Sequence, residues 1–217
     1  MENELNENKY NGIIIFGEMS TGKDALADYL INSDKRCCKY NIGNAVRQFF
    51  SIIKVNPEFR GKDRFLGQLI ADKLREVHPY FLNDYCLSLI YEKWQKQYNW
   101  DNSNVFIENF NDEIKKQLSI IIKHEIPIIV GGRTKDDFTY WTNKNFFTVG
   151  IICDKSIKFE RLCKRDGTLV ANNSNFKHNT EIDVADIAKN KCNIVIDNSF
   201  DLQHLHNEAD KLIKLFK

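Results

Sequence analysis

The sequence predicts an α/β fold built on a central parallel sheet of about five strands. Short, continuously apolar runs are typical of strands that are buried on both faces of such a sheet. Segments with helical periodicity lie between these runs, which is the alternation that produces parallel strands joined by helices. The expected strands are 12–16, 126–130, 147–152 and 194–196, with a weaker one at 37–41, where Lys39 interrupts the apolar pattern.

Helices are expected wherever apolar residues recur at spacings of three and four. Leu26 and Leu30 show this spacing in the first of these segments. The expected helices are 23–31, 45–53, 66–77, 81–94, 106–123, 136–142, 155–164 and 202–216. We therefore predict a single domain with a core at 10–42 and 105–217, and a helical insert at about 43–104. A polar loop at about 166–180 is rich in asparagine and completes this organisation.

Composition excludes several classes of protein. The 217 residues are 42% hydrophobic and 28% charged, which is ordinary for a globular chain and rules out wholesale disorder. The net charge of +1 favours neither nucleic acid nor membrane as a partner. The polar start of the chain lacks the features of a secretory signal, and the six cysteines show no zinc spacing. We expect a cytoplasmic protein with free thiols; a homodimer is left open.

The most informative segment joins the first expected strand to the first expected helix. It runs Gly17-Glu18-Met19-Ser20-Thr21-Gly22-Lys23-Asp24 and fits the phosphate-loop pattern GxxxxGK[ST], except that Asp24 takes the hydroxyl position. Glycines allow backbone N–H groups to wrap around phosphate oxygens, and the helix that follows presents its positive end to the same anion. All eight residues are therefore predicted to bind nucleotide phosphates, with Lys23 reaching the β- and γ-phosphates.

Asp24 is the departure from the pattern, and it has two interpretations. A carboxylate beside a triphosphate repels it unless a metal ion lies between them, so Asp24 is a candidate Mg²⁺ ligand. Acidic residues are also favourable in the first turn of any helix, so Asp24 can serve simply to start the helix.

The Gly-Lys-Asp ending of the loop, followed by Ala25 and then Ala27-Asp28-Tyr29-Leu30, resembles the deoxynucleoside monophosphate kinases of phages and bacteria. These enzymes belong to the adenylate-kinase-like group of P-loop kinases, to which dephospho-CoA kinase is related. The resemblance implies a three-layer P-loop fold with a helical acceptor-binding insert and a short lid at 166–180. It also implies ATP and Mg²⁺ as cofactors and a nucleoside monophosphate as the acceptor.

The same resemblance implies which arginines bind the acceptor phosphate. Arg47, Arg64 and Arg75 lie in the insert and are similar in position to the acceptor ligands, although an exposed helix charge is the alternative for Arg47 and Arg75. Arg133 follows a glycine pair at the end of the 126–130 strand, where a guanidinium can bind phosphate through two hydrogen bonds. The aspartate that the family has near those glycines is missing, and Asp24, Asp136 or Asp137 is expected to compensate.

Arg161 and Arg165, which are four residues apart, are similar in style to the Arg-x-x-Arg pattern of the family's lid helix. Residues four apart share one helix face, so the two cations repel each other unless an anion lies between them. In phosphoryl transfer that anion is the charge that develops on the transferred group. Together with Lys23 and Arg133, they are the predicted catalytic residues; a solvated basic face is the alternative.

Three other functions compete with a nucleoside monophosphate kinase. Dephospho-CoA kinase fits the ending around Asp197-Asn198, but the Asp-x-Asp expected after its first helix is absent, with Asn32-Ser33-Asp34 in its place. A non-catalytic nucleotide-binding protein is favoured by the missing aspartate and by Asp24. A GTPase is disfavoured, because Asn143-Lys144-Asn145 lacks the aspartate of the guanine motif.

Overall fold

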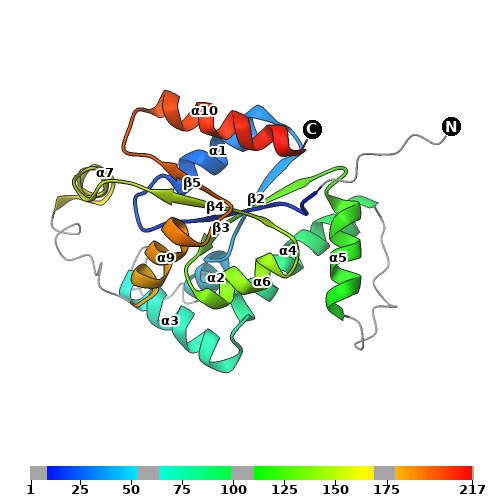
Figure 1. Ribbon diagram of the computed structural model, residues 1–217. Coiled ribbons are helices and arrows are strands. Elements are labelled where there is room, and N and C mark those ends of the chain that lie inside the picture. Colours follow the sequence, from blue (N-terminus) through cyan, green and yellow to red (C-terminus); the bar gives the residue numbers. More distant parts are fainter. Residues whose placement is uncertain (1–8, 53–63, 99–109, 169–178, 217) are drawn as a thin grey trace. The chain divides into compact units, whose positions relative to one another are not determined.

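The computed structural model describes residues 9–52, 64–98, 110–168 and 179–216 (Figure 1). The chain divides into two compact units. The larger unit contains residues 1–39 and 105–217, and the smaller contains 40–104. Most of the predicted lid, 169–178, lies outside the described residues.

A five-stranded parallel sheet organises the larger unit, as the sequence predicted. The central strand β1 pairs in parallel with β3 on one side and β4 on the other, and β4 pairs in parallel with β5. The strands lie in the order β2-β3-β1-β4-β5. Their bounds are Ile13–Phe16 (β1), Cys37–Asn41 (β2), Ile126–Gly132 (β3), Phe147–Ile152 (β4) and Ile194–Asp197 (β5).

Helices cover both faces of this sheet. Helices α1 and α10 pack together on one face, while α6 and α9 lie on the other (Figure 1). The helices of this unit are α1 (Lys23–Ser33), α5 (Phe110–Ile121), α6 (Lys135–Thr142), α7 (Lys155–Asp166), α9 (Asn179–Asn190) and α10 (Leu202–Ile213), followed by the 3₁₀ turn Lys214–Phe216.

The apolar core follows from the alternation of side chains along β1. Ile13 and Ile15 are buried in a cluster with Leu26 and Leu30 of α1 and with apolar residues of α10. Phe16 faces the other way, and its ring lies 5.6 Å from that of Phe138 on α6. Because both faces are covered, the strand is apolar at every position, which explains the continuous runs in the sequence.

The smaller unit consists of helices packed on one another. They are α2 (Asn44–Ile52), α3 (Arg64–Val77) and α4 (Phe81–Tyr98). On α4, Leu82, Cys86, Ile90 and Trp94 are buried at a spacing of four, which is the apolar stripe of an amphipathic helix. Among the described helices, none combines the length and the apolar character needed to span a bilayer.

All six cysteines are free thiols, as expected from their spacing. Cys153 directly follows β4 and Cys192 lies two residues before β5, and both are only partly buried. Strand β2 does include Lys39, because its ammonium group has carboxylate partners on α1.

Strand β4 packs closely on α9 at Gly150. A Cβ atom there would lie 1.9 Å from the carbonyl oxygen of Ala188 on α9 and 2.9 Å from its Cα. Both atoms belong to the backbone, so they cannot move aside as a flexible side chain could.

We therefore expect Gly150→Ala to lower the free energy of unfolding by about 1–3 kcal/mol or more, because the added methyl group forces α9 away from the sheet. Urea denaturation followed by circular dichroism measures this change. Asn32→Ala, at an exposed position of α1, is the control and should stay within about 0.5 kcal/mol of the parent. An unchanged midpoint for Gly150→Ala would contradict the close packing of β4 on α9.

Candidate phosphate-binding site

The loop between β1 and α1, which has the phosphate-loop sequence pattern, ends in a glycine with a left-handed backbone. Gly22 precedes the helix with φ +100°, a left-handed conformation that favours glycine. A Cβ atom at Gly22 would also lie 2.2 Å from Nδ2 of Asn198. Position 22 therefore requires glycine for two independent reasons, and the chain turns there directly into the N-terminus of α1.

The carbonyl oxygen of Glu18 is the internal hydrogen-bond acceptor of this loop. It accepts hydrogen bonds from Oγ1 of Thr21 at 2.9 Å and from Nζ of Lys23 at 2.6 Å. The backbone N–H of Thr21 also donates to it, at 3.4 Å. The side chain of Lys23 is thus folded onto the loop, with 9% of the residue exposed. An incoming phosphate oxygen can replace this carbonyl as the partner of the ammonium group.

Asn198 connects the phosphate loop to the end of the sheet. It follows β5 and is buried, and its Nδ2 donates a hydrogen bond of 2.8 Å to the carbonyl oxygen of Thr21. Its backbone N–H donates to the carbonyl oxygen of Ile152 at the end of β4. Asn198 lies in the short connection between β5 and α10, and its side chain supports the loop from there.

An ion pair between a buried lysine and a partly exposed glutamate connects the loop to α7. Nζ of Lys158 lies 2.5 Å from a carboxylate oxygen of Glu18, and only 6% of the Lys158 side chain is exposed. Met19, next in the loop, packs on Leu162 of the same helix. Lys158 was not singled out in the sequence, because a lysine in a helix with many charges carries no sign of burial.

The electrostatics of the site centre on Lys23. Burial is the main cause that lowers its pKa from 10.5 to about 7, and the positive charge of Arg133 adds to this effect. Asp24 opposes the shift, whereas Arg165 contributes to it. A buried ammonium group among other cations is costly unless an anion joins them. The arrangement is therefore suited to a polyanion.

Arg161 also lies beside the loop. One of its guanidinium nitrogens would be 4.0 Å from a Cβ atom at Gly22, and the same nitrogen lies 3.4 Å from Sγ of Cys153. The structure thus brings the four predicted catalytic residues, Lys23, Arg133, Arg161 and Arg165, into the neighbourhood of the loop. Their catalytic role stays a prediction.

Asp137, one of the carboxylates expected to replace the missing strand-end aspartate, has a structural role. It is fully buried and accepts hydrogen bonds from the backbone N–H groups of Arg133 (2.8 Å) and Thr134 (3.0 Å). Its own N–H donates to Oγ1 of Thr134, which completes a capping box at the start of α6. Asp137 therefore fixes the turn that carries Arg133. Asp136, its neighbour, is exposed.

Asp24, the predicted metal ligand, forms an ion pair with Lys39 of β2 at 2.7 Å. Among the described residues, no cluster of three or more acidic, histidine or cysteine side chains is arranged to hold a metal ion. Mg²⁺ bound with a nucleotide needs only one or two carboxylates besides phosphates and water. Such an ion fits this loop, but a direct bond to Asp24 would compete with Lys39.

The three predicted acceptor ligands in the insert belong to the smaller unit. Arg47 is exposed on α2 and hydrogen-bonds Oδ1 of Asn44. Arg75 on α3 has 14% of its side chain exposed and lies 3.9 Å from Asp72. Arg64 is the first residue of α3, and its side chain lies outside the description. Their role in binding an acceptor stays a prediction.

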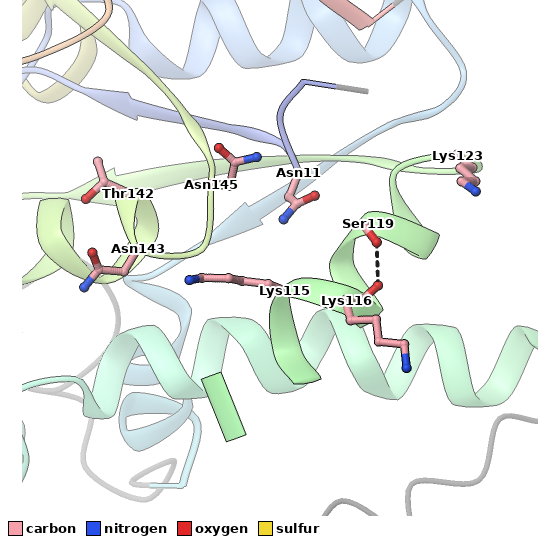
Figure 2. A pocket seen from close by; sticks show the side chains of 8 residues that line it. All are labelled: Asn11, Lys115, Lys116, Ser119, Lys123, Thr142, Asn143 and Asn145. Atoms are coloured by element: carbon pink, nitrogen blue, oxygen red, sulfur yellow. Dashed lines mark hydrogen bonds between the residues drawn. The ribbon is translucent and has the colours of Figure 1, made fainter. Parts of the chain in front are cut away.

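A pocket of about 700 Å³ lies at the opposite edge of the sheet from the phosphate loop. Asn11 precedes β1, and Asn143 and Asn145 precede β4, so this edge is formed by the amino ends of the strands. In Figure 2, Lys115 extends toward Asn143, whereas Lys116 points the other way. The remaining lining residues are Ser119, Lys123 and Thr142.

The strand order and the loop at the carboxyl end of the central strand define an α/β fold of the P-loop type. Two solved structures similar to this chain are a gluconokinase from Sinorhizobium meliloti 1021 (11% identity, TM-score 0.40) and an uncharacterized protein from Eubacterium ventriosum ATCC 27560 (16%, 0.44). Each likeness covers 95% of this chain and 98% of the other. No family model and no curated protein matches the sequence.

The lowered pKa of Lys23 predicts a pH dependence of nucleotide binding. Above pH 7 the free lysine is increasingly neutral, while bound phosphates restore its charge, so binding takes up a proton. We expect the affinity for metal-free ATP to fall by about tenfold per pH unit above pH 8, where the phosphates are already ionised. Calorimetric titration in buffers of different ionisation enthalpy measures both the affinity and the proton.

Lys23→Arg is the matched variant for this experiment, because its guanidinium group stays protonated throughout the range. Whatever the absolute ATP affinity of this variant, that affinity should not fall with rising pH between pH 8 and 10. An equal slope in the parent and in Lys23→Arg would show that Lys23 is not the titrating group.

The bond between Asn198 and Thr21 predicts a second effect. Asn198→Asp removes the buried donor and places a carboxylate against the Thr21 carbonyl, so the free energy of unfolding should fall by about 1–3 kcal/mol. ATP affinity should fall as well, because the loop loses a support. Chemical denaturation and calorimetry measure the two effects. Asn207→Asp, at an exposed position of α10, is the control; equal behaviour of the two variants would contradict the role of Asn198.

Proposed function

We propose that this protein is an ATP-dependent phosphotransferase that acts on a small phosphate-bearing acceptor, most specifically a nucleoside or deoxynucleoside monophosphate. The single observation that supports it best is the position of Lys23. The lysine is buried in a glycine-bounded loop at a helix N-terminus, within electrostatic range of Arg133 and Arg165. A bound polyanion would offset the electrostatic cost of placing these positive charges together.

In the proposed reaction, the donor phosphates lie along the loop, where Lys23 and the backbone N–H groups bind them. Mg²⁺, when bound with the nucleotide, neutralises phosphate charge and is held chiefly by phosphate oxygens and water. The ammonium group of Lys23 leaves the Glu18 carbonyl and takes a phosphate oxygen as its partner. The loop itself needs little rearrangement, because Asn198 and Lys158 already support it.

The transfer step chiefly requires positive charge close to the reacting phosphates. An ionised acceptor phosphate is itself the nucleophile, so no general base is required, but two anions must be brought together. Arg133, held by the Asp137 cap, and Arg161 and Arg165 of α7 are positioned to offset that repulsion in the larger unit. In the smaller unit, Arg47, Arg64 and Arg75 are the proposed acceptor ligands.

Dephospho-CoA is the second candidate acceptor. It is favoured by the segment in which β5 ends at Asp197, Asn198 follows, and the chain leads into α10. The two functions differ only in the acceptor. Release of ADP with dephospho-CoA but with no monophosphate would select this candidate. Binding of ATP without transfer to any acceptor would instead select a regulatory nucleotide-binding protein.

The proposal predicts that Lys23→Ala lowers turnover by about 10²-fold or more, the loss typical of removing a donor that stabilises charge in the transition state. The test is an assay of ADP release with a panel of ribo- and deoxyribonucleoside monophosphates. Dephospho-CoA belongs in the panel, and so does gluconate, an acceptor without a phosphate. Lys189→Ala, at an exposed position of α9, is the control. Unchanged turnover in Lys23→Ala, or activity with gluconate alone, would contradict the proposal.

A further inference from the structure

Lys39 of β2 holds two carboxylates of α1. Its ammonium nitrogen lies 2.7 Å from Oδ1 of Asp24 and 3.0 Å from Oδ1 of Asp28. Only 24% of the lysine side chain is exposed, whereas the two aspartates are 66% and 60% exposed. The lysine is thus the better fixed partner, and the carboxylates reach toward it from the helix.

The spacing of the two aspartates explains why a cation is needed there. Residues four apart lie on the same helix face, where like charges destabilise each other. Burial alone would lower the pKa of Lys39, but the hydrogen bonds with Asp24 and Asp28 raise it above its usual value. Lys39 is therefore a cation at neutral pH, and it lies within 3.0 Å of both carboxylates.

Asp24 is also close enough to Lys23 for its negative charge to oppose the lowering of the Lys23 pKa. An uncompensated carboxylate here would repel the phosphates and compete with them for the positive end of α1. The ammonium group of Lys39 offsets that field, because it lies 2.7 Å from the carboxylate of Asp24 and slightly farther, 3.0 Å, from that of Asp28. The loop thus tolerates an acid where the usual pattern has a hydroxyl group.

We propose that Lys39 is a positioning residue for polyphosphate binding: it neutralises Asp24 and holds its carboxylate away from the phosphates, so that Asp24 is not a ligand of Mg²⁺. This inference rests on the proposed nucleotide site, and it replaces the metal-binding interpretation of Asp24. It assigns Lys39 an indirect action, through Asp24, rather than a contact with the nucleotide.

The first measurement is the affinity for ADP without metal ions, in EDTA. Lys39→Met should weaken binding by about five- to tenfold, the effect of one uncompensated charge nearby in a largely aqueous setting. Lys39→Arg keeps the charge and should bind as the parent does. Asp28→Asn removes the other partner of Lys39, one helical turn farther along α1, and should change the affinity by less than about twofold. Thermal unfolding of each variant confirms that it is folded.

The double variant Lys39→Met with Asp24→Asn separates an indirect action from a direct one. If Lys39 acts through Asp24, the double variant recovers the parent affinity. If it remains as weak as Lys39→Met, the lysine contacts the phosphates itself and the proposal is overturned. Equal affinities of the parent and Lys39→Met would overturn it as well, while leaving the nucleotide site intact.

The second measurement concerns the metal. In Asp24→Asn, the ratio of ADP affinities with and without Mg²⁺ should equal that of the parent, because the ion is held by phosphates and water. A ratio reduced by tenfold or more in this variant would make Asp24 a metal ligand and overturn the proposal. Absence of any ADP or ATP binding by the parent protein would overturn the proposed function and this inference together.

Discussion

The site depends on a buried ammonium group that has positive neighbours and a backbone carbonyl as its partner. Lys23 is held against the carbonyl oxygen of Glu18, and burial together with Arg133 depresses its pKa to about 7. A carbonyl dipole compensates an ammonium charge less well than an anion does. The electrostatics of the free loop are therefore unfavourable, and a bound polyanion of the kind we propose would relieve them.

Parallel strands explain how this state is assembled from distant parts of the chain. Lys23, Arg133, Arg161 and Asn198 each follow a different strand of the same sheet, and the carboxyl ends of parallel strands meet at one edge. Each residue needs only a short turn or one helix to reach the loop. The topology thus brings these residues together, and the local sequence supplies the glycine-bounded loop and the charges.

Much of this arrangement could be predicted from the sequence, because it depends on local patterns. The apolar runs gave β1, β3, β4 and β5, and the spacing from Gly17 to Lys23 gave the loop. What escaped prediction depends on pairs that are far apart in the chain. Lys158 meets Glu18 across 140 positions, and Asn198 meets Thr21 across 177. Lys39 weakened the prediction of β2, since its partners on α1 could not be seen in the sequence of the strand.

The Glu18–Lys158 pair illustrates why such contacts matter more for conformation than for stability. Removing two charges from water costs as much as, or more than, their attraction returns, so a buried pair is weak evidence of stabilisation. Its geometry is nevertheless demanding, because an alternative loop conformation would leave Lys158 buried with no counter-charge. Together with the Asn198 bond to Thr21, the pair favours the loop conformation seen here, in which Lys23 lies at the N-terminus of α1. The loop is therefore already organised in the free protein, so in the proposed function little of the phosphates' binding energy would be spent on ordering the backbone.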